Sequence, residues 1–403
     1  MAEHLVVSGY IEESKEKWKT VKVGSIGKII TGKTPKTTVT ENYGGIVPFL
    51  TPSDDMDAKY VSKTSRTLSV IGVQMVKNFL LPANSVCVSC IGSDLGKVVI
   101  TTEPTVTNQQ INSIIVDTEC FDVSFVYYAM VILGKHLNVI SKASTTVPIV
   151  NKSRFSDYEI VCPPLQIQKK VASILSVLDE KIALNNQIND NLEQQASALV
   201  EQYFESVSSI VPFAEIMSFE NGFAFKSSTY LPSGQYRIIT IKNVQDGQID
   251  TTGAACIDEL PQRMKEGCVL QIGDALLSLT GNVGRVGIVC ENGLLLNQRV
   301  AKIVPHRKEL LPLLYFIYRQ PSTKTQLESI AKGTAQLNLS PVETLKLTVP
   351  YNSEVALDLS HTLTPIYQAI ITNNQQSINL ASMRDALLPK LMSGEIDVTG
   401  IGI

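Results

Sequence analysis

The string from Gly27 to Thr34, GKIITGKT, contains residues that could bind phosphate. It satisfies the Walker A pattern GxxxxGK[ST], in which backbone amides and a lysine hold a nucleotide when a strand precedes the loop and a helix follows it. Pro35 follows directly, and the next residues are rich in threonine and glycine, which disfavour a helix. A glycine turn is therefore the favoured interpretation, and a P-loop nucleotide-binding protein stays as an alternative.

Other residue types that carry chemistry are scattered. Cys87 and Cys90 could supply half of a zinc site, but no second cysteine or histidine pair follows, and the alternation in SVCVSCIG favours a strand. The carboxylates of Asp54, Asp55 and Asp57 are typical of a solvated turn. The sequence has no HExxH pair, no GxSxG, no GxGxxG and no obvious S-adenosylmethionine loop. We therefore expect no catalytic residue, no metal site and no cofactor in this chain.

Basic residues occur beside predicted turns in both halves of the chain. Lysine and arginine on loops contact the phosphates and base edges of DNA, although each one taken alone could be an ordinary solvated charge. The candidate DNA-binding residues are Lys33, Thr34, Lys36, Lys97, Lys152 and Arg154 in the first half, and Lys226, Lys242, Arg285, Arg299 and Lys332 in the second.

A long amphipathic stretch must position these surfaces. From Pro163 to Ser206, apolar residues and asparagines recur at alternating steps of three and four, the spacing of a coiled-coil seam. No proline or glycine interrupts residues 165–206, so we predict one helix of about 42 residues, about 60 Å long. Because one face of this helix is apolar, it requires a partner.

The partner lies in the same chain, because the sequence contains an internal duplication. Residues 369–388 repeat the pattern of residues 181–200, so that Asn185 matches Asn373 and Leu192 matches Leu380 at one constant offset. Short β-like runs and one buried helix precede each long helix. We therefore predict an α+β fold with two similar globular domains, joined and separated by two long antiparallel coiled-coil helices. The expected segments are a lead-in at 1–17, a first domain at 18–163, a central helix at 164–207, a second domain at 208–350, a C-terminal helix at 351–393 and a tail at 394–403.

The duplication also predicts how the helices meet. Two direct repeats related by a pseudo-twofold axis run their long helices antiparallel, which brings Asn185 toward Asn373 and places Leu178 near Leu380. A buried asparagine in a seam fixes the register at some cost in stability. The predicted core of the helix pair comprises Leu175, Leu178, Ile182, Asn185, Leu192, Leu199, Ile366, Ile370, Asn373, Leu380 and Leu387.

Composition limits the class of protein. The 403 residues are 44% hydrophobic and 18% charged, which is ordinary for a globular protein of two or three domains. No apolar run approaches the roughly 18 residues of a membrane span, and the first residues are too charged for a signal peptide, so we expect a cytoplasmic protein with no membrane contact. The net charge of −3 argues against a uniformly basic surface but leaves room for local basic faces.

The long helix PPLQIQKKVASILSVLDEKIALNNQINDNLEQQASALVEQYF, its C-terminal copy ending in DALLPKLMSGEID, and the turns TGKTPKTT and NGFAFKSSTY carry a family resemblance. Over nearly its whole length, the chain resembles the specificity subunit of type I restriction-modification enzymes. The resemblance implies two target recognition domains that each bind half of a split double-stranded DNA target, with paired helices that fix the gap. It also implies partner subunits: two methyltransferase subunits, and restriction nuclease and translocase subunits. S-adenosylmethionine, ATP and Mg²⁺ are then expected on those partners.

The long helix predicts the form of the target. A separation of about 60 Å exceeds one turn of DNA, about 34 Å, so two short half-sites are expected with bases between them that are not recognised. With a net charge of −3, we expect weak DNA binding by this chain alone and tight binding in the complex. The alternative from another class is a coiled-coil structural adaptor, which would show no DNA preference.

Overall fold

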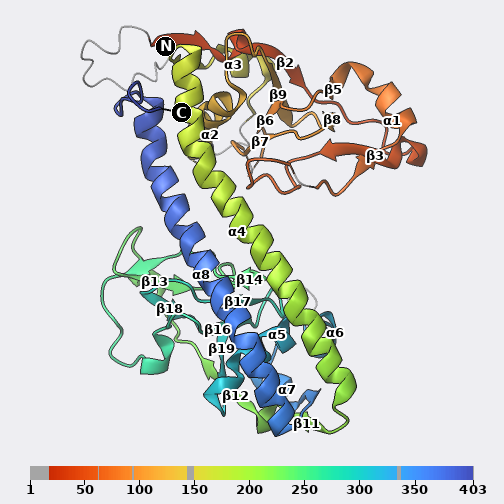
Figure 1. Ribbon diagram of the computed structural model, residues 1–403, viewed down its shortest axis with the longest axis vertical. Helices are drawn as coiled ribbons and strands as arrows, with labels where there is room; N and C mark the ends of the chain where they lie inside the picture. Colours follow the sequence, from red (N-terminus) through yellow and green to blue (C-terminus); the bar gives the residue numbers. More distant parts are fainter. Residues whose placement is uncertain (1–17, 62, 93–94, 143–148, 334–336, 403) are drawn as a thin grey trace. The chain divides into compact units, whose positions relative to one another are not determined.

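Two long helices, α4 at Leu165–Ser206 and α8 at Ser353–Met392, dominate the described part of this computed structural model (Figure 1). The structure describes residues 18–61, 63–92, 95–142, 149–333 and 337–402. The chain divides into two compact units, and the division passes through both long helices. Unit 1 comprises Met1–Ala183 with Leu380–Ile403, and unit 2 comprises Leu184–Asn379. The predicted lead-in at residues 1–17 lies outside the described residues.

Both long helices begin and end within two residues of their predicted bounds. Two prolines precede α4, and no proline or glycine lies within it. The Oδ1 of Asn352 caps α8 by accepting hydrogen bonds from the backbone N–H groups of Glu354 (3.1 Å) and Val355 (3.2 Å). Gly394 follows the last turn of α8 with a φ of +72°, which glycine adopts without strain.

The described strands of unit 1 form sheets with the orders β1-β10, β2-β9-β6-β7 and β4-β3-β8-β5. Neighbouring strands are antiparallel except for β3 and β8, which are parallel. The strands are β1 Lys19–Lys22, β2 Gly27–Thr31, β3 Tyr43–Leu50, β4 Thr67–Leu68, β5 Leu80–Leu81, β6 Val86–Ser89, β7 Val98–Ile100, β8 Thr105–Thr107, β9 Ile111–Val116 and β10 Glu159–Cys162, and the short helices are α1 Val70–Met75 and α3 Lys152–Asp157.

Helix α2, Val123–Lys142, forms the centre of the unit 1 core. Phe125 and Tyr128 of α2 are buried together with Val88 of β6, Leu175 of α4 and Leu388 of α8. The helix therefore packs between the sheet β2-β9-β6-β7 and the unit 1 parts of both long helices. Burial of each large apolar side chain of this kind contributes about 1.5 to 3 kcal/mol.

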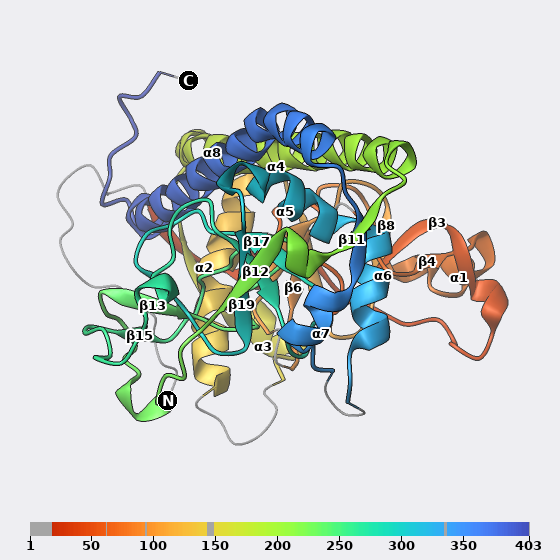
Figure 2. The same cartoon turned by 90° about the horizontal axis from the view of Figure 1, so that it is seen from below.

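The described strands of unit 2 have the orders β11-β20, β12-β19-β16-β17-β14 and β15-β13-β18. The pairs β13–β18 and β14–β17 are parallel. The strands are β11 Ile210–Pro212, β12 Met217–Asn221, β13 Tyr236–Ile239, β14 Gly247–Gln248, β15 Cys256–Ile257, β16 Ala275–Ser278, β17 Val286–Ile288, β18 Leu294–Leu296, β19 Val300–Pro305 and β20 Thr348–Pro350, and the shorter helices are α5 Leu311–Arg319, α6 Pro321–Ile330 and α7 Pro341–Lys346. In Figure 2, α5 lies between the long helices and the five-stranded sheet, and its residues share one buried core with both.

The two units repeat one topology. The order β2-β9-β6-β7 corresponds to β12-β19-β16-β17, and the parallel pair β3–β8 corresponds to β13–β18. In unit 1, α2 packs where α5 packs in unit 2. The predicted α+β fold with a duplicated globule and two long helices is therefore confirmed.

The P-loop alternative is wrong. Residues Gly27–Thr31 are strand β2, and an irregular loop follows Thr34 instead of a helix. A Cβ on Gly32 would lie 2.2 Å from the carbonyl oxygens of Thr107 and Asn108, so this glycine allows the close approach of two chain segments. Gly222 in unit 2 meets the carbonyl oxygen of Asn297 in the same way, also at 2.2 Å.

The thiols of Cys87 and Cys90 lie in different apolar clusters of unit 1. Burial raises the pKa of Cys87 to about 12 and that of Cys90 to about 11. Both are therefore protonated side chains of the core at neutral pH, in agreement with the predicted strand. In the described residues, no helix is both long enough and apolar enough to cross a membrane.

Candidate nucleic-acid interface

Each unit has one sheet edge where two parallel strands end side by side. In unit 1, β3 and β8 end at Leu50 and Thr107, and the backbone N–H of Asn108 donates to the carbonyl oxygen of Leu50 (3.0 Å). In unit 2, the N–H of Asn297 donates to the carbonyl oxygen of Ile239 (3.2 Å). We call this place the strand-end edge: residues 51–54 with 108–110 in unit 1, and residues 240–243 with 297–299 in unit 2.

The same turn opens both strand-end edges. The backbone N–H and Oγ1 of Thr51 donate to one carboxylate oxygen of Asp54 at 2.7 and 2.9 Å. Thr240 makes the same two bonds to Oδ1 of Asn243, at 2.9 and 2.8 Å. Burial alone would raise the pKa of Asp54, but hydrogen bonds from Ser65 and Thr51 outweigh it and hold the pKa below its ordinary value. These turn residues are therefore structural parts of a shared frame.

Four of the predicted DNA-binding residues lie on this frame or next to it. Lys242 and Arg299 belong to the edge of unit 2, and both are exposed. In unit 1, the Oγ1 of Thr34 donates to Oε1 of Gln109 (2.7 Å), and the exposed Lys33 places its ammonium 5.5 Å from the centre of the Phe79 ring. The structure thus brings these predicted residues together at the edges.

Two of the predicted residues are tied to the protein instead. The Nζ of Lys97 forms an ion pair with Asp57 (3.2 Å), and the Nη1 of Arg285 donates to Oε1 of Gln245 (2.5 Å). Lys97 and Arg285 occupy equivalent turns, and their partners lie in equivalent loops. Both side chains therefore hold the loop that follows the strand-end turn. They would have to give up these partners, Asp57 and Gln245, to contact DNA directly.

The remaining predicted residues are exposed but separate in the chain. Lys152 and Arg154 lie on α3, where the backbone N–H of Arg154 donates to Oδ1 of the cap residue Asn151 (2.9 Å). Lys36 and Lys226 lie in loops, and the backbone of Lys332 pairs with that of Asn338. For all of the predicted DNA-binding residues, contact with DNA stays a prediction.

The predicted residues of the helix pair are buried or half-buried, and the asparagine contact is present in unit 2. The Nδ2 of Asn185 donates to the carbonyl oxygen of Asn373 (3.3 Å) and to Oγ of Ser377 (3.2 Å). Asn189 pairs with Asn373 and with Asn374, each at 2.8 Å. Asn185 thus contacts residues up to Ser377, whereas Asn189, one turn further along α4, contacts residues only up to Asn374. Because the contacted residues of α8 lie earlier in the chain as those of α4 lie later, the two helices run antiparallel in unit 2. The Oδ1 of Asn185 is buried without a hydrogen-bond partner.

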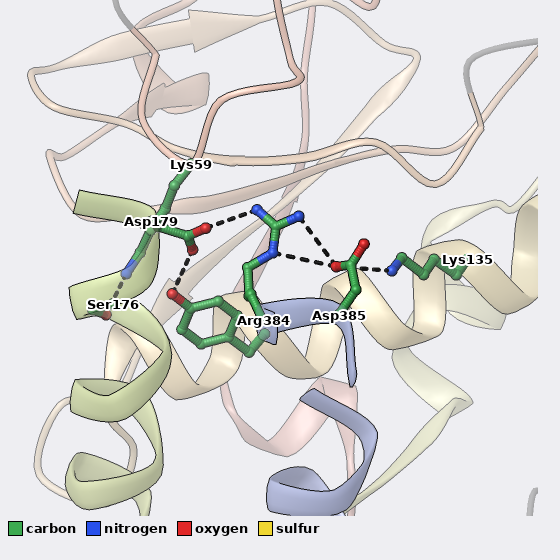
Figure 3. A network of polar contacts seen from close by, with 7 residues as sticks. Lys59, Lys135, Ser176, Asp179, Arg384 and Asp385 are labelled. Atoms are coloured by element: carbon green, nitrogen blue, oxygen red, sulfur yellow. Dashed lines mark hydrogen bonds and ion pairs between the residues drawn. The ribbon is translucent and has the colours of Figure 1, made fainter. Parts of the chain in front are cut away.

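A polar network that the sequence did not reveal joins α4 to the unit 1 globule (Figure 3). The hydroxyl of Tyr128 donates to Oδ2 of Asp179 (2.6 Å), and the Nη1 of Arg384 donates to Oδ1 (2.8 Å). Arg384 and Lys135 also pair with Asp385 at 3.1 and 3.5 Å. Burial would lower the pKa of Arg384, but the hydrogen bond and charge of Asp179 outweigh it, so the pKa lies above its ordinary value. The α4 carboxylate thus holds α2 and α8 together.

Lys59 makes another contact between the unit 1 globule and α4. Its ammonium donates to Oγ of Ser176 (2.7 Å) and lies 4.9 to 5.6 Å from the ring centres of Tyr60, Tyr127 and Tyr128. Only 8% of the residue is exposed, and burial lowers the pKa of its ammonium. Because Lys59 follows the strand-end turn in the chain, it fixes that loop to α4.

Unit 2 has a counterpart of this network. Glu193 of α4 accepts from the hydroxyl of Tyr315 (3.1 Å) and pairs with Arg319, which also pairs with Asp246 (3.1 Å) in the loop after the strand-end turn. Asp179 and Glu193 each follow a seam leucine and stand two heptads apart. Two carboxylates at one heptad position are the sequence signal that could have revealed both networks.

The α+β fold is duplicated, and each copy has an equivalent edge that carries different side chains. This arrangement is typical of a binding protein with two related recognition domains. Residues 15–194 and 207–380 match the family described as Type I restriction modification DNA specificity domain. The chain therefore belongs to this family, and its role is the sequence-specific recognition of DNA.

Curated relatives agree with this assignment, and a solved structure has the same fold. The chain is similar to the Type I restriction enzyme HindI specificity subunit of Haemophilus influenzae, with 37% identity over 183 residues, which are 44% of this chain and 39% of that protein. It is 24% identical to the Type I restriction enzyme MjaIX specificity subunit of Methanocaldococcus jannaschii, over 94% of both chains. The crystal structure of a Type-I restriction-modification system S subunit from M. genitalium has the same fold, with a TM-score of 0.55 and 17% identity over 94% of this chain and 98% of the other.

Proposed function

We propose that this chain directs a type I restriction-modification complex to DNA, with each unit binding one half of a split target. The observation that carries the proposal is the strand-end edge, which has one frame in both units but displays different residues. The side chains that reach base edges determine which bases are recognised, whereas the frame only orients these side chains. Two equal frames with different displayed residues suit two short, different half-sites.

The partners in this proposal are two methyltransferase subunits together with restriction nuclease and translocase subunits. These subunits would bind S-adenosylmethionine, ATP and Mg²⁺, and this chain would supply no catalytic residue. The names of the relatives as specificity subunits support such a division of work. The complex would act on DNA in the cytoplasm.

The helix pair would set the gap between the half-sites. Helix α4 has 42 residues, which at 1.5 Å per residue is about 60 Å. This exceeds the roughly 34 Å of one DNA turn, so the target would contain bases that neither unit contacts. The asparagines of the seam would keep the helices in one register and the gap constant.

The experiment that tests the proposal is methylome sequencing of cells that carry this chain and its methyltransferase subunit. We expect one split motif, with methylated adenine, that disappears when the gene for this chain is deleted. Retention of the motif after deletion, or the lack of any motif beside an active methyltransferase, would instead favour a structural adaptor.

Exchange of residues 18–163 for the same segment of a relative is the complementary test. Only one half of the motif is expected to change, because the second unit keeps its own edge. A simultaneous change in both halves would contradict the assignment of one half-site to each unit.

A further inference from the structure

The strand-end edge of unit 2 borders a hollow with a volume of about 470 Å³. Its lining comes from Tyr230 before β13, the turn after β13, the residues before β15 and the turn between β18 and β19, and the two turns contribute Lys242, Asn297 and Arg299. The volume lies within the range of pockets that hold small ligands and exceeds the volume of a phosphate group. The hollow can therefore hold a group as large as the exposed edge of a nucleotide.

The charges at this hollow are not balanced. None of the residues that line it is aspartate or glutamate, while Lys242 and Arg299 are both exposed cations. In the described part of the chain, the charged ends of these two side chains form no hydrogen bond or ion pair. Other arginines of unit 2 do have partners: Arg237 pairs with Glu291 (2.8 Å), and Arg319 pairs with Asp246 (3.1 Å). In a chain with a net charge of −3, two unpaired cations at one hollow favour an anionic or acceptor-rich ligand.

The backbone under Arg299 is fixed by the frame. The Oδ1 of Asn297 accepts from the backbone N–H of Arg299 (3.3 Å), and Asn297 is only 7% exposed. The arginine therefore starts from a rigid turn, and its guanidinium is free to bind outward. A guanidinium that is carried by a fixed backbone turn and has no partner among the described residues suits the bidentate contact that arginine makes with O6 and N7 of guanine.

The equivalent edge of unit 1 has the same frame with different residues in these two places. Ser53 stands where unit 2 has Lys242, and Gln110 stands where unit 2 has Arg299. The amide of Gln110 is engaged, since its Oε1 accepts from Nδ2 of Asn108 (2.9 Å). The turn and the buried asparagine are thus shared, whereas the two displayed residues differ.

We propose that Arg299 is a specificity-determining residue of unit 2 that selects a guanine in one half-site, and that Lys242 holds a phosphate next to it. This inference rests on the proposed function and names the residues that carry it out at one edge. Because unit 1 has Gln110 and Ser53 at the equivalent places, its half-site differs at the corresponding base, and it has no lysine at the place of Lys242.

The test compares Arg299→Gln, Lys242→Ser and the control Arg263→Gln, each in the full chain together with its methyltransferase subunit. Arg263 is an exposed arginine of unit 2 that does not line the hollow, so its variant loses the same charge. Methylome sequencing gives the motif, and binding of duplexes with single base changes, measured at several salt concentrations, gives the discrimination.

For Arg299→Gln, we expect loss of the preference for guanine at one position of one half-site, by about 5- to 150-fold, with the other half-site unchanged. For Lys242→Ser, we expect weaker binding to all sequences and a salt dependence with a slope smaller by about 0.9, without a change in motif. The control should leave the motif unchanged.

An unchanged motif in Arg299→Gln, with an affinity equal to that of the control, would overturn the inference. This failure differs from failure of the proposed function, in which the unaltered chain itself would specify no split motif. A change of base preference in Lys242→Ser would also contradict the roles given to the two residues.

Discussion

Asp179 links α4 to α2 and α8 within unit 1. Its side chain is 11% exposed and accepts from both Tyr128 and Arg384. In Asp179→Ala, the tyrosine and the arginine lose their acceptor while they stay partly buried, so we expect the free energy of unfolding of unit 1 to fall by about 2 to 3 kcal/mol. The only tryptophan, Trp18, packs against Gly394 in unit 1, so its fluorescence during urea unfolding measures this unit.

The matched control for this prediction is Asp385→Ala. The side chain of Asp385 is 49% exposed and pairs with the same arginine, so its loss should cost less than about 1 kcal/mol. Equal destabilisation by the two variants would show that Asp179 acts only as a surface charge.

Lys59 predicts a specific dependence of stability on pH. Burial lowers the pKa of its ammonium below the ordinary 10.5, so in the folded state it loses its proton at a lower pH than in the unfolded state. Between these two pKa values the unfolded state binds more protons, and the free energy of unfolding therefore rises with pH. The stability of the unaltered protein minus that of Lys59→Met should increase as the pH rises toward 10.5, measured by urea unfolding. A difference that stays constant or decreases would show that the ammonium is not desolvated.

At the scale of residues, sequence reasoning found basic side chains but could not sort them by role. Lys97 and Arg285 looked equal to Lys242 and Arg299, because all four lie beside predicted turns. The sheet brings Asp57 to Lys97 and Gln245 to Arg285 across about 40 residues of chain. Such pairings depend on strand register, which a single sequence does not define.

At the scale of elements, the long helices were predictable and the short ones were not. A seam repeated over 42 residues gives a strong periodic signal, and the bounds of α4 followed from prolines and from the lack of helix breakers. Helices α1, α3 and α7 have six residues each, which is less than two turns, and their main signals are the caps Ser69, Asn151 and Ser340.

Asn185 in the seam of the helix pair fixes the register of the two helices at a cost in stability, and this cost can be measured. Asn185 is fully buried, and its Oδ1 has no partner, so part of its polarity is not compensated. In Asn185→Leu, we expect the free energy of unfolding of unit 2 to rise by about 1 kcal/mol, measured by far-ultraviolet circular dichroism in urea. The neighbouring Asn186 is exposed, so Asn186→Leu should leave the stability unchanged. Loss of stability in Asn185→Leu would mean that its hydrogen bonds to Asn373 and Ser377 outweigh the cost of its burial.

At the scale of the whole molecule, the duplication was visible in the sequence because anchors such as Asn185 and Asn373 recur at one offset. The division into units was not visible. The predicted segments treat each long helix as a spacer outside the globular domains, whereas each compact unit includes part of both helices. Periodicity describes a helix as one element, but its membership in a core depends on which side chains of α2 or α5 pack against it.

This division suggests where the proposed control of the gap can be tested without damage to either unit. Seven residues of seam sequence inserted after Ala183 in α4, together with seven after Asn379 in α8, fall at the boundary between the units and leave the contacts within each unit in place. One heptad lengthens a helix by about 10 Å, close to the rise of three base pairs, while it keeps the seam on the same face. We therefore expect methylome sequencing to show the same two half-sites with a gap longer by about three base pairs. Insertion in α4 alone should abolish methylation, because the two helices would then be out of register, and an unchanged gap in the double insertion would mean that the helix pair does not determine the spacing.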